Sequence, residues 1–86
     1  MTNPAPTLLR ELKMPDLGLG DHPMRLCMWL VKQGASVVAG DPVVEVLCDV
    51  LTVDLPAPCD GVLKQKLAAE GDTLESGRLL AVFEVG

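Results

Sequence analysis

Three kinds of side chain in this sequence are candidates for covalent attachment of a small molecule or for a zinc site. They are the thiols of three cysteines, one imidazole and the amines of four lysines. The residues are Cys27, Cys48, Cys59, His22, Lys13, Lys32, Lys64 and Lys66. The cysteines and the histidine lack the spacing of a zinc site, and no nucleophile stands beside a base and an orienting group. The sequence therefore predicts no metal site and no catalytic residues, and indicates that the chain is not an enzyme.

Cys48 is the cysteine with the clearest alternative role, because a thiol can hold an acyl group or exchange disulfides. Reactivity requires a lowered pKa, and the adjacent Asp49 carboxylate is expected to raise the pKa of the thiol instead. A cysteine in a strand is more often a small apolar residue. Cys27 and Cys59 are interpreted as packing or neutral positions.

Composition restricts the classes of partner. The net charge is −5, from twelve acidic and seven basic residues, without a run of Lys or Arg. This excludes nucleic acid and anionic membranes as partners, and suits a protein that meets a basic partner face. No apolar run approaches the roughly 18 residues needed to cross a bilayer. An odd number of cysteines without a secretory signal favours a reducing compartment, most simply the cytoplasm.

Short apolar runs separated by Gly, Pro and Asp predict one small all-β domain. Residues 1–8 are expected to be a flexible N-terminal lead-in, and residues 9–86 the domain. The expected strands are Leu9–Met14, Arg25–Lys32, Val43–Cys48, Leu51–Leu55, Gly61–Leu67 and Leu79–Val85, with short strands near Val37 and Leu74.

An internal repeat indicates two similar β-units. Trp29–Gly40 matches Lys66–Gly77 at a constant offset of 37 residues, and an apolar strand follows each. Gly34 and Gly71, together with Gly40 and Gly77, are expected to need a positive φ. One unit alone would leave an apolar face and open strand edges, so the two units are expected to pack together.

This duplicated unit with a hairpin between its halves resembles the biotinyl/lipoyl domain family, over about Glu11–Val85. The residues that carry the resemblance are Met14–Gly18, Trp29–Lys32 with Gly34, Gly40–Val46, Thr52–Pro58, Gly61–Leu63, and Glu70–Asp72 with Gly77. The Met-Pro-x-Leu-Gly opening and the x-Pro-Ala-Pro stretch resemble the lipoyl branch, found in acyltransferase components of 2-oxo acid dehydrogenase complexes.

The resemblance implies a flattened eight-stranded barrel, made of two four-stranded antiparallel sheets related by a pseudo-two-fold axis. It also implies a lysine at the hairpin tip that carries lipoate, which swings between active sites. Trp29 matches a common family position and is interpreted as core. The loop Gly18–Pro23, which contains Asp21 and His22, corresponds to a loop that lies beside the lysine hairpin and helps partner enzymes recognise the domain.

The hairpin tip departs from the family pattern. It consists of Leu47, Cys48, Asp49, Val50 and Leu51, with Val50 at the position of the modified lysine. Amide attachment needs a primary amine, which valine lacks, and no lysine lies between residues 33 and 63. We therefore expect no bound cofactor. Lys64 and Lys66 flank a strand and are interpreted as a solvated strand face.

The leading hypothesis is an unmodified docking module for a 2-oxo acid dehydrogenase-type or acyltransferase partner. Its expected interaction surface is the five-residue tip with Asp21 and His22, because exposed apolar clusters often mark interfaces. Two alternatives stay open. One is an acyl or redox carrier modified at Cys48 or a noncanonical lysine, and the other is a structural remnant of a former carrier. An engineered replacement of the lysine is a further explanation of Val50, although not of Leu47.

Overall fold

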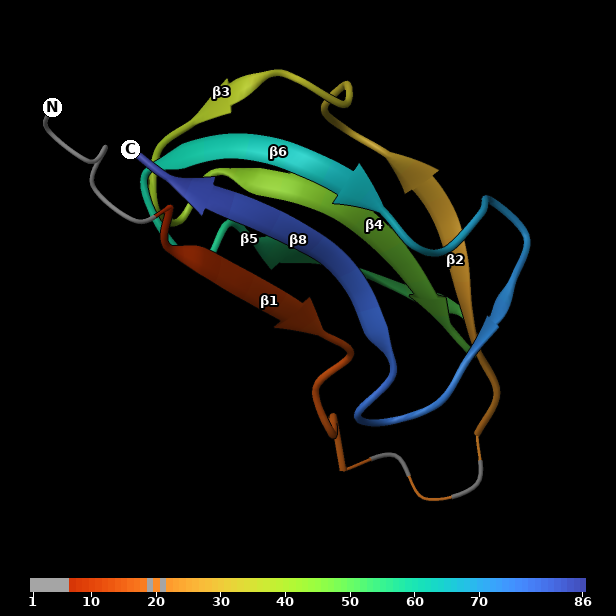
Figure 1. Ribbon diagram of the computed structural model, residues 1–86. Helices are drawn as coiled ribbons and strands as arrows, with labels where there is room; N and C mark the ends of the chain where they lie inside the picture. Colours follow the sequence, from red (N-terminus) through yellow and green to blue (C-terminus); the bar gives the residue numbers. More distant parts are fainter. Residues whose placement is uncertain (1–6, 19, 21) are drawn as a thin grey trace, which may run out of the picture.

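Eight antiparallel strands form two four-stranded sheets that face each other (Figure 1). The computed structural model describes residues 7–18, 20 and 22–86. One sheet has the order β1-β8-β6-β3 and the other β5-β4-β2-β7. The strands are β1 (Leu9–Lys13), β2 (Met24–Trp29), β3 (Ser36–Val37), β4 (Pro42–Cys48), β5 (Leu51–Pro56), β6 (Gly61–Lys66), β7 (Thr73–Leu74) and β8 (Leu79–Val85).

The predicted fold class is confirmed, and the strand bounds agree with the sequence to within a few residues. The largest difference is at β2, which ends at Trp29 and not at Lys32. The chain bends at Leu30, although the Leu30 amide still donates to the Val43 carbonyl over 2.9 Å. Residues 1–6 of the expected lead-in lie outside the described residues. The Leu8 carbonyl already accepts a hydrogen bond from the Val85 amide at 2.9 Å, next to the β1–β8 pairing.

Backbone hydrogen bonds join the two repeat units reciprocally. The Gly34 amide donates to the Leu63 carbonyl over 2.7 Å, and the Gly71 amide donates to the Leu26 carbonyl over the same distance. Donors and acceptors are both related by the 37-residue offset found in the sequence. The four repeat glycines have φ between 88° and 93°, which confirms the expected left-handed backbone.

The short strands β3 and β7 belong to the sheets of the opposite units. β3 pairs with β6, and β7 pairs with β2. Each unit therefore completes the sheet of the other, and neither half contains all the strands of one sheet. This exchange explains why two imperfect copies of a unit form one domain with a shared core.

The core between the sheets is aliphatic, with Phe83 as its one fully buried aromatic side chain. Trp29, interpreted as core from the sequence, is only partly buried and packs against the edge of the core. Its indole N–H donates to the Ala68 carbonyl over 3.0 Å, and the Lys66 amine lies 5.1 Å from the ring centroid. Trp29 and Lys66 are equivalent positions of the repeat, so this contact joins the two units.

The β1–β2 connection is where the two units differ most in length. Met14 and Ala57 occupy equivalent places in the hydrogen bonding. The Met14 amide donates to the Arg78 carbonyl, and the Ala57 amide donates to the Asp41 carbonyl. The two acceptors are themselves related by the 37-residue offset. They are 43 residues apart, six more than the repeat offset of 37. The extra six residues fall between Met14 and Met24. The loop predicted to contribute to recognition is therefore an insertion relative to the other unit.

Gly61 is the glycine that the packing requires most strictly. A Cβ atom at this position would lie 2.0 Å from the backbone carbonyl oxygen of Glu84 on the paired strand β8. Backbone atoms cannot rotate away as a side chain does, so β6 and β8 would have to separate.

We predict that Gly61→Ala lowers the free energy of unfolding by about 3 kcal/mol, and Tm by roughly 10 °C or more. Gly86→Ala is the matched control, because its Cβ would meet its nearest neighbour at 3.4 Å, an ordinary contact. Thermal unfolding followed by circular dichroism measures both variants. Equal melting temperatures for Gly61→Ala and the parent chain would contradict the close approach of β6 and β8.

Candidate functional site

The tip of the β4–β5 hairpin is the most exposed apolar part of the described chain. Val50 is 83% exposed and Leu51 is 63% exposed. The strands remain paired up to Cys48 and Leu51, so Asp49 and Val50 form a two-residue turn. Asp49 has a φ of 58°, the one positive value among the described non-glycine residues. A positive φ is a backbone conformation that non-glycine residues seldom adopt, with Asp and Asn among the more frequent exceptions.

Alternation along β4 separates the tip residues into two faces. Cys48 is buried, at 1% exposure, and points into the barrel with Val46, whereas Leu47 is half-buried on the outer face. Burial raises the pKa of the Cys48 thiol, through desolvation of the thiolate. Cys48 was expected to be part of the interaction surface, but a side chain this deeply buried contributes almost no surface to a partner.

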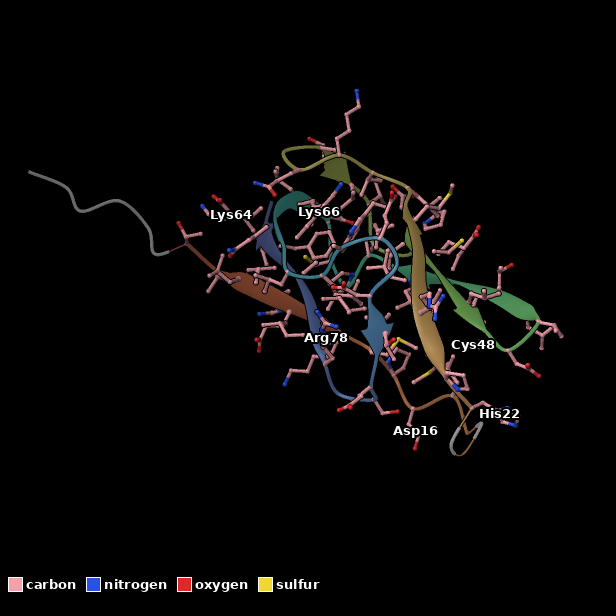
Figure 2. All side chains as sticks on the ribbon, turned by 90° about the vertical axis from the view of Figure 1, so that its right-hand side faces the viewer. Asp16, His22, Cys48, Lys64, Lys66 and Arg78 are labelled. Atoms are coloured by element: carbon pink, nitrogen blue, oxygen red, sulfur yellow. The ribbon has the colours of Figure 1, made fainter. Side chains whose placement is uncertain are left out.

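The β1–β2 loop lies beside the tip. A shallow hollow of about 210 Å³ is lined by Pro23, Arg25, Leu47 and Asp49, and so joins the loop, β2 and the turn. Figure 2 shows His22 and Cys48 on the side of the molecule where this hairpin projects, with Lys64 on the opposite side. His22 is exposed. Asp21, the other loop residue of the expected surface, lies outside the described residues.

The same end of the molecule includes residues that the sequence analysis did not select. Arg25 pairs in register with Leu47, and this pairing places the Arg25 side chain between the loop and the tip. A second hollow of about 430 Å³ shares Pro23 with the first and extends to β7. It is lined by Gly20, His22, Pro23, Met24, Thr73, Leu74, Glu75 and Ser76. The 37-residue repeat predicted that the two units pack together, but not that β7 lies next to β2.

The other candidate residues have structural surroundings. Cys27 is exposed, and its thiol donates a hydrogen bond to the Glu45 carboxylate, which raises the pKa of Cys27 together with desolvation and nearby acidic charge. Cys59 is partly buried against the core. Within residues 7–18, 20 and 22–86, no cluster of three or more His, Cys, Asp or Glu side chains could hold a metal ion. In the same residues, no helix is long and apolar enough to cross a membrane.

The lysines of β6 lie away from the hairpin tip. The Lys64 amine forms an ion pair with the Glu84 carboxylate at 3.0 Å, and Lys66 stacks over Trp29. Both are held in a strand and not in a tight turn. The turn itself presents the carboxylate of Asp49 and the methyl groups of Val50, so it offers no amine to which an acyl group could be attached.

The chain belongs to the Biotin_lipoyl family, described as "Biotin-requiring enzyme", whose match covers residues 10–83. Members of this family carry lipoate or biotin on a lysine. The fold and the family match therefore define a lipoyl-domain-like protein.

Similar curated proteins are acyltransferase components of multienzyme systems. One is the "Dihydrolipoyllysine-residue succinyltransferase component of 2-oxoglutarate dehydrogenase complex" of Bartonella vinsonii, 37% identical over 76 residues, which are 88% of this chain and 18% of that protein. Another is the "Dihydrolipoyllysine-residue acetyltransferase component of acetoin cleaving system" of Pseudomonas putida, 36% identical over 78 residues, which are 91% of this chain and 21% of that protein. The chain thus spans about a fifth of these relatives.

Solved structures show the same fold. The lipoyl domain of the 2-oxoglutarate dehydrogenase complex from Azotobacter vinelandii superposes with a TM-score of 0.68 at 28% identity, covering 88% of this chain and 98% of that domain. The urea carboxylase of Kluyveromyces lactis contains a region with a TM-score of 0.75 at 23% identity, covering 96% of this chain and 7% of the enzyme.

We predict that alkylation distinguishes the cysteines at pH 8. Cys48 should react with iodoacetamide only after unfolding, because it is buried and its pKa is raised. Cys27 should react slowly in the folded protein, and Glu45→Gln should accelerate it by removing the carboxylate that disfavours the thiolate. Peptide mass mapping of native and denatured samples measures each site. Fast labelling of Cys48 in the folded protein would contradict its burial.

Proposed function

We propose that this chain is an unmodified, non-catalytic docking module that binds a 2-oxo acid dehydrogenase-type or acyltransferase component through its hairpin tip. The observation that carries this proposal is Val50, which is 83% exposed at the turn between β4 and β5. In this reading Val50 occupies the position of the lipoyl lysine. The protein works in the cytoplasm with its partner and carries no lipoate.

The chemistry at the tip supports the absence of lipoate. Lipoate is linked to its domain by an amide, whose formation needs a primary amine on the protein. The residues of the turn and its flanks, from Leu47 to Leu51, include no lysine, and the nearest lysines in sequence are Lys32 and Lys64. The residues present therefore do not fit the group that the family carries.

The apolar tip supports docking over loss of function alone. Two exposed apolar side chains, Val50 and Leu51, follow a non-glycine residue in the left-handed region. Burying a Val or Leu side chain against a partner is worth about 1.5–3 kcal/mol. Exposed apolar clusters at the end of a small domain are typical of interaction sites. The adjoining hollow beside Arg25 adds polar contacts to the same surface.

The alternative of a carrier modified at Cys48 is not favoured by the geometry. A thioester at Cys48 would place the acyl group inside the barrel, where the thiol is 1% exposed. A lysine carrier on β6 would have to break the Lys64–Glu84 ion pair or remove Lys66 from Trp29. If the domain were only a structural remnant of a former carrier, nothing would explain why its exposed tip is apolar.

Intact mass is the first test of the unmodified state. We expect the protein purified from its native host under non-reducing conditions to have the mass of the bare chain. An added mass would overturn the proposal. Fragmentation would then assign the added group to a cysteine or to a lysine.

Val50→Asp tests the docking tip. It should weaken binding to the partner component by about tenfold or more, because a carboxylate in an apolar contact must lose its hydration without gaining a partner. The free energy of unfolding should change by less than about 0.5 kcal/mol, as for other exposed positions. The binding partners are the purified decarboxylase and acyltransferase components of the host's 2-oxo acid dehydrogenase complexes, measured by calorimetry.

Val38→Asp is the matched control. Val38 is also an exposed valine, at 61%, but it precedes β4 at the end of the strand far from the turn. It should leave affinity unchanged. Equal affinities for Val50→Asp and the parent chain, or no binding of any component, would reject the proposed function.

A further inference from the structure

We infer that the hairpin docks against a partner surface that combines an apolar socket with basic side chains beside it. This inference rests on the proposed docking role, and adds the chemistry of the partner. Two observations carry it. The first is the distribution of charge over the two sheets, and the second is a pair of acidic residues, Glu45 and Asp54, on the same hairpin as the apolar tip.

The two sheets carry opposite charge. The strands β5, β4, β2 and β7 contain two acidic residues and one basic residue, namely Asp54, Glu45 and Arg25. The strands β1, β8, β6 and β3 contain four basic and two acidic residues, namely Arg10, Lys13, Lys64, Lys66, Glu11 and Glu84. The net strand charge is thus −1 on the sheet that ends in the apolar turn and +2 on the other. Asp49 in the turn adds a further negative charge to the hairpin.

Two of these carboxylates oppose each other on the hairpin itself. Glu45 on β4 and Asp54 on β5 are direct register partners, so their Cβ atoms are about 5 Å apart. Like charges in this position destabilise a hairpin. Neither carboxylate belongs to an ion pair within residues 7–18, 20 and 22–86. A lysine or arginine from outside the chain would convert this repulsion into attraction at both carboxylates.

The acidic pair and the apolar tip lie within one footprint. Asp49 lies four positions beyond Glu45 along the hairpin, a distance of about 13 Å in an extended chain. A standard interface buries about 800 Å² on each partner, which is ample to cover both features. A single partner surface can therefore cover Val50 and Leu51 while its cations reach Glu45 and Asp54.

The charge distribution also argues against a second copy of this chain as the occupant. β5 is one of the two edge strands of the acidic sheet, and pairing two β5 strands would bring the Asp54–Glu45 pairs of both chains into one continuous sheet. Repulsion between like charges across an interface selects against such a partner.

Two short amphipathic peptides of equal leucine content test this inference, one with only lysine as its charged residue and the other with only glutamate. Each is titrated into the isotope-labelled domain at low salt, and amide shifts are followed by NMR. The lysine peptide should shift amides of β4, β5 and the turn, whereas the glutamate peptide should shift none of them. Shifts centred on other strands, equal binding of both peptides, or no shifts at millimolar lysine peptide would each overturn the inference.

Charge variants assign the effect to the hairpin. Asp54→Asn should weaken binding of the lysine peptide by about threefold and Asp54→Lys by about tenfold, as expected for one exposed charge contact removed or reversed. Glu11→Gln and Glu11→Lys on β1 are matched controls, since Glu11 is also an exposed acidic residue of an edge strand, and should change affinity less than the Asp54 variants. Equal effects at the two positions would overturn the inference.

The peptides contain no dehydrogenase component, so this result is independent of the component-binding test. If the domain binds both peptides equally while Val50→Asp still weakens docking with the components, only the proposed partner chemistry is rejected. Failure of docking with the components would reject the proposed function itself.

Discussion

The reciprocal exchange of short strands between the two repeat units is the constraint on which the rest of the structure depends. β3 completes the sheet that contains β6, and β7 completes the sheet that contains β2. The amides of Gly34 and Gly71 secure the exchange from left-handed backbone positions that other residues adopt only with strain. Since the two halves hold each other in place, the described residues form one shared core with Phe83 as its fully buried aromatic side chain.

This arrangement leaves the β4–β5 turn outside the cross-unit hydrogen bonds. The reciprocal bonds run from the turn glycines Gly34 and Gly71 to strands β6 and β2, whereas Asp49 and Val50 extend beyond the last register pair of the hairpin. A left-handed aspartate costs about 1 kcal/mol, and the fold tolerates it because the core does not depend on the turn. A tip with this freedom can change its chemistry while the barrel stays the same.

The strands and the glycine conformations could be predicted from sequence, because period-two alternation and a repeat at constant offset are local signals. The burial of Cys48 could not be predicted from the family pattern alone. Its position at the tip suggested exposure, but alternation from the buried Val46 turns it inward. Trp29 was interpreted as core because it matches a common family position, which takes no account of the irregularity between Leu26 and Met28. That β-bulge shifts the alternation, so Met28 is 44% exposed and Trp29 lies at the edge of the core.

The contribution of β7 and Arg25 to the candidate surface depends on distant parts of the chain, and no local pattern could reveal it. The repeat predicted that two units pack together, but not which strand of one unit lies beside which strand of the other. Once β7 pairs with β2, the loop residues Gly20, His22 and Pro23 line a hollow with the second unit, and Pro23 also lines the hollow beside the hairpin. The insertion breaks the symmetry of the barrel at the end where the apolar turn lies. Under the proposed docking role, this asymmetry lets a partner bind one end of the barrel in preference to the other. The described loop residues and the exposed Val50 of the turn therefore lie at one end of the barrel.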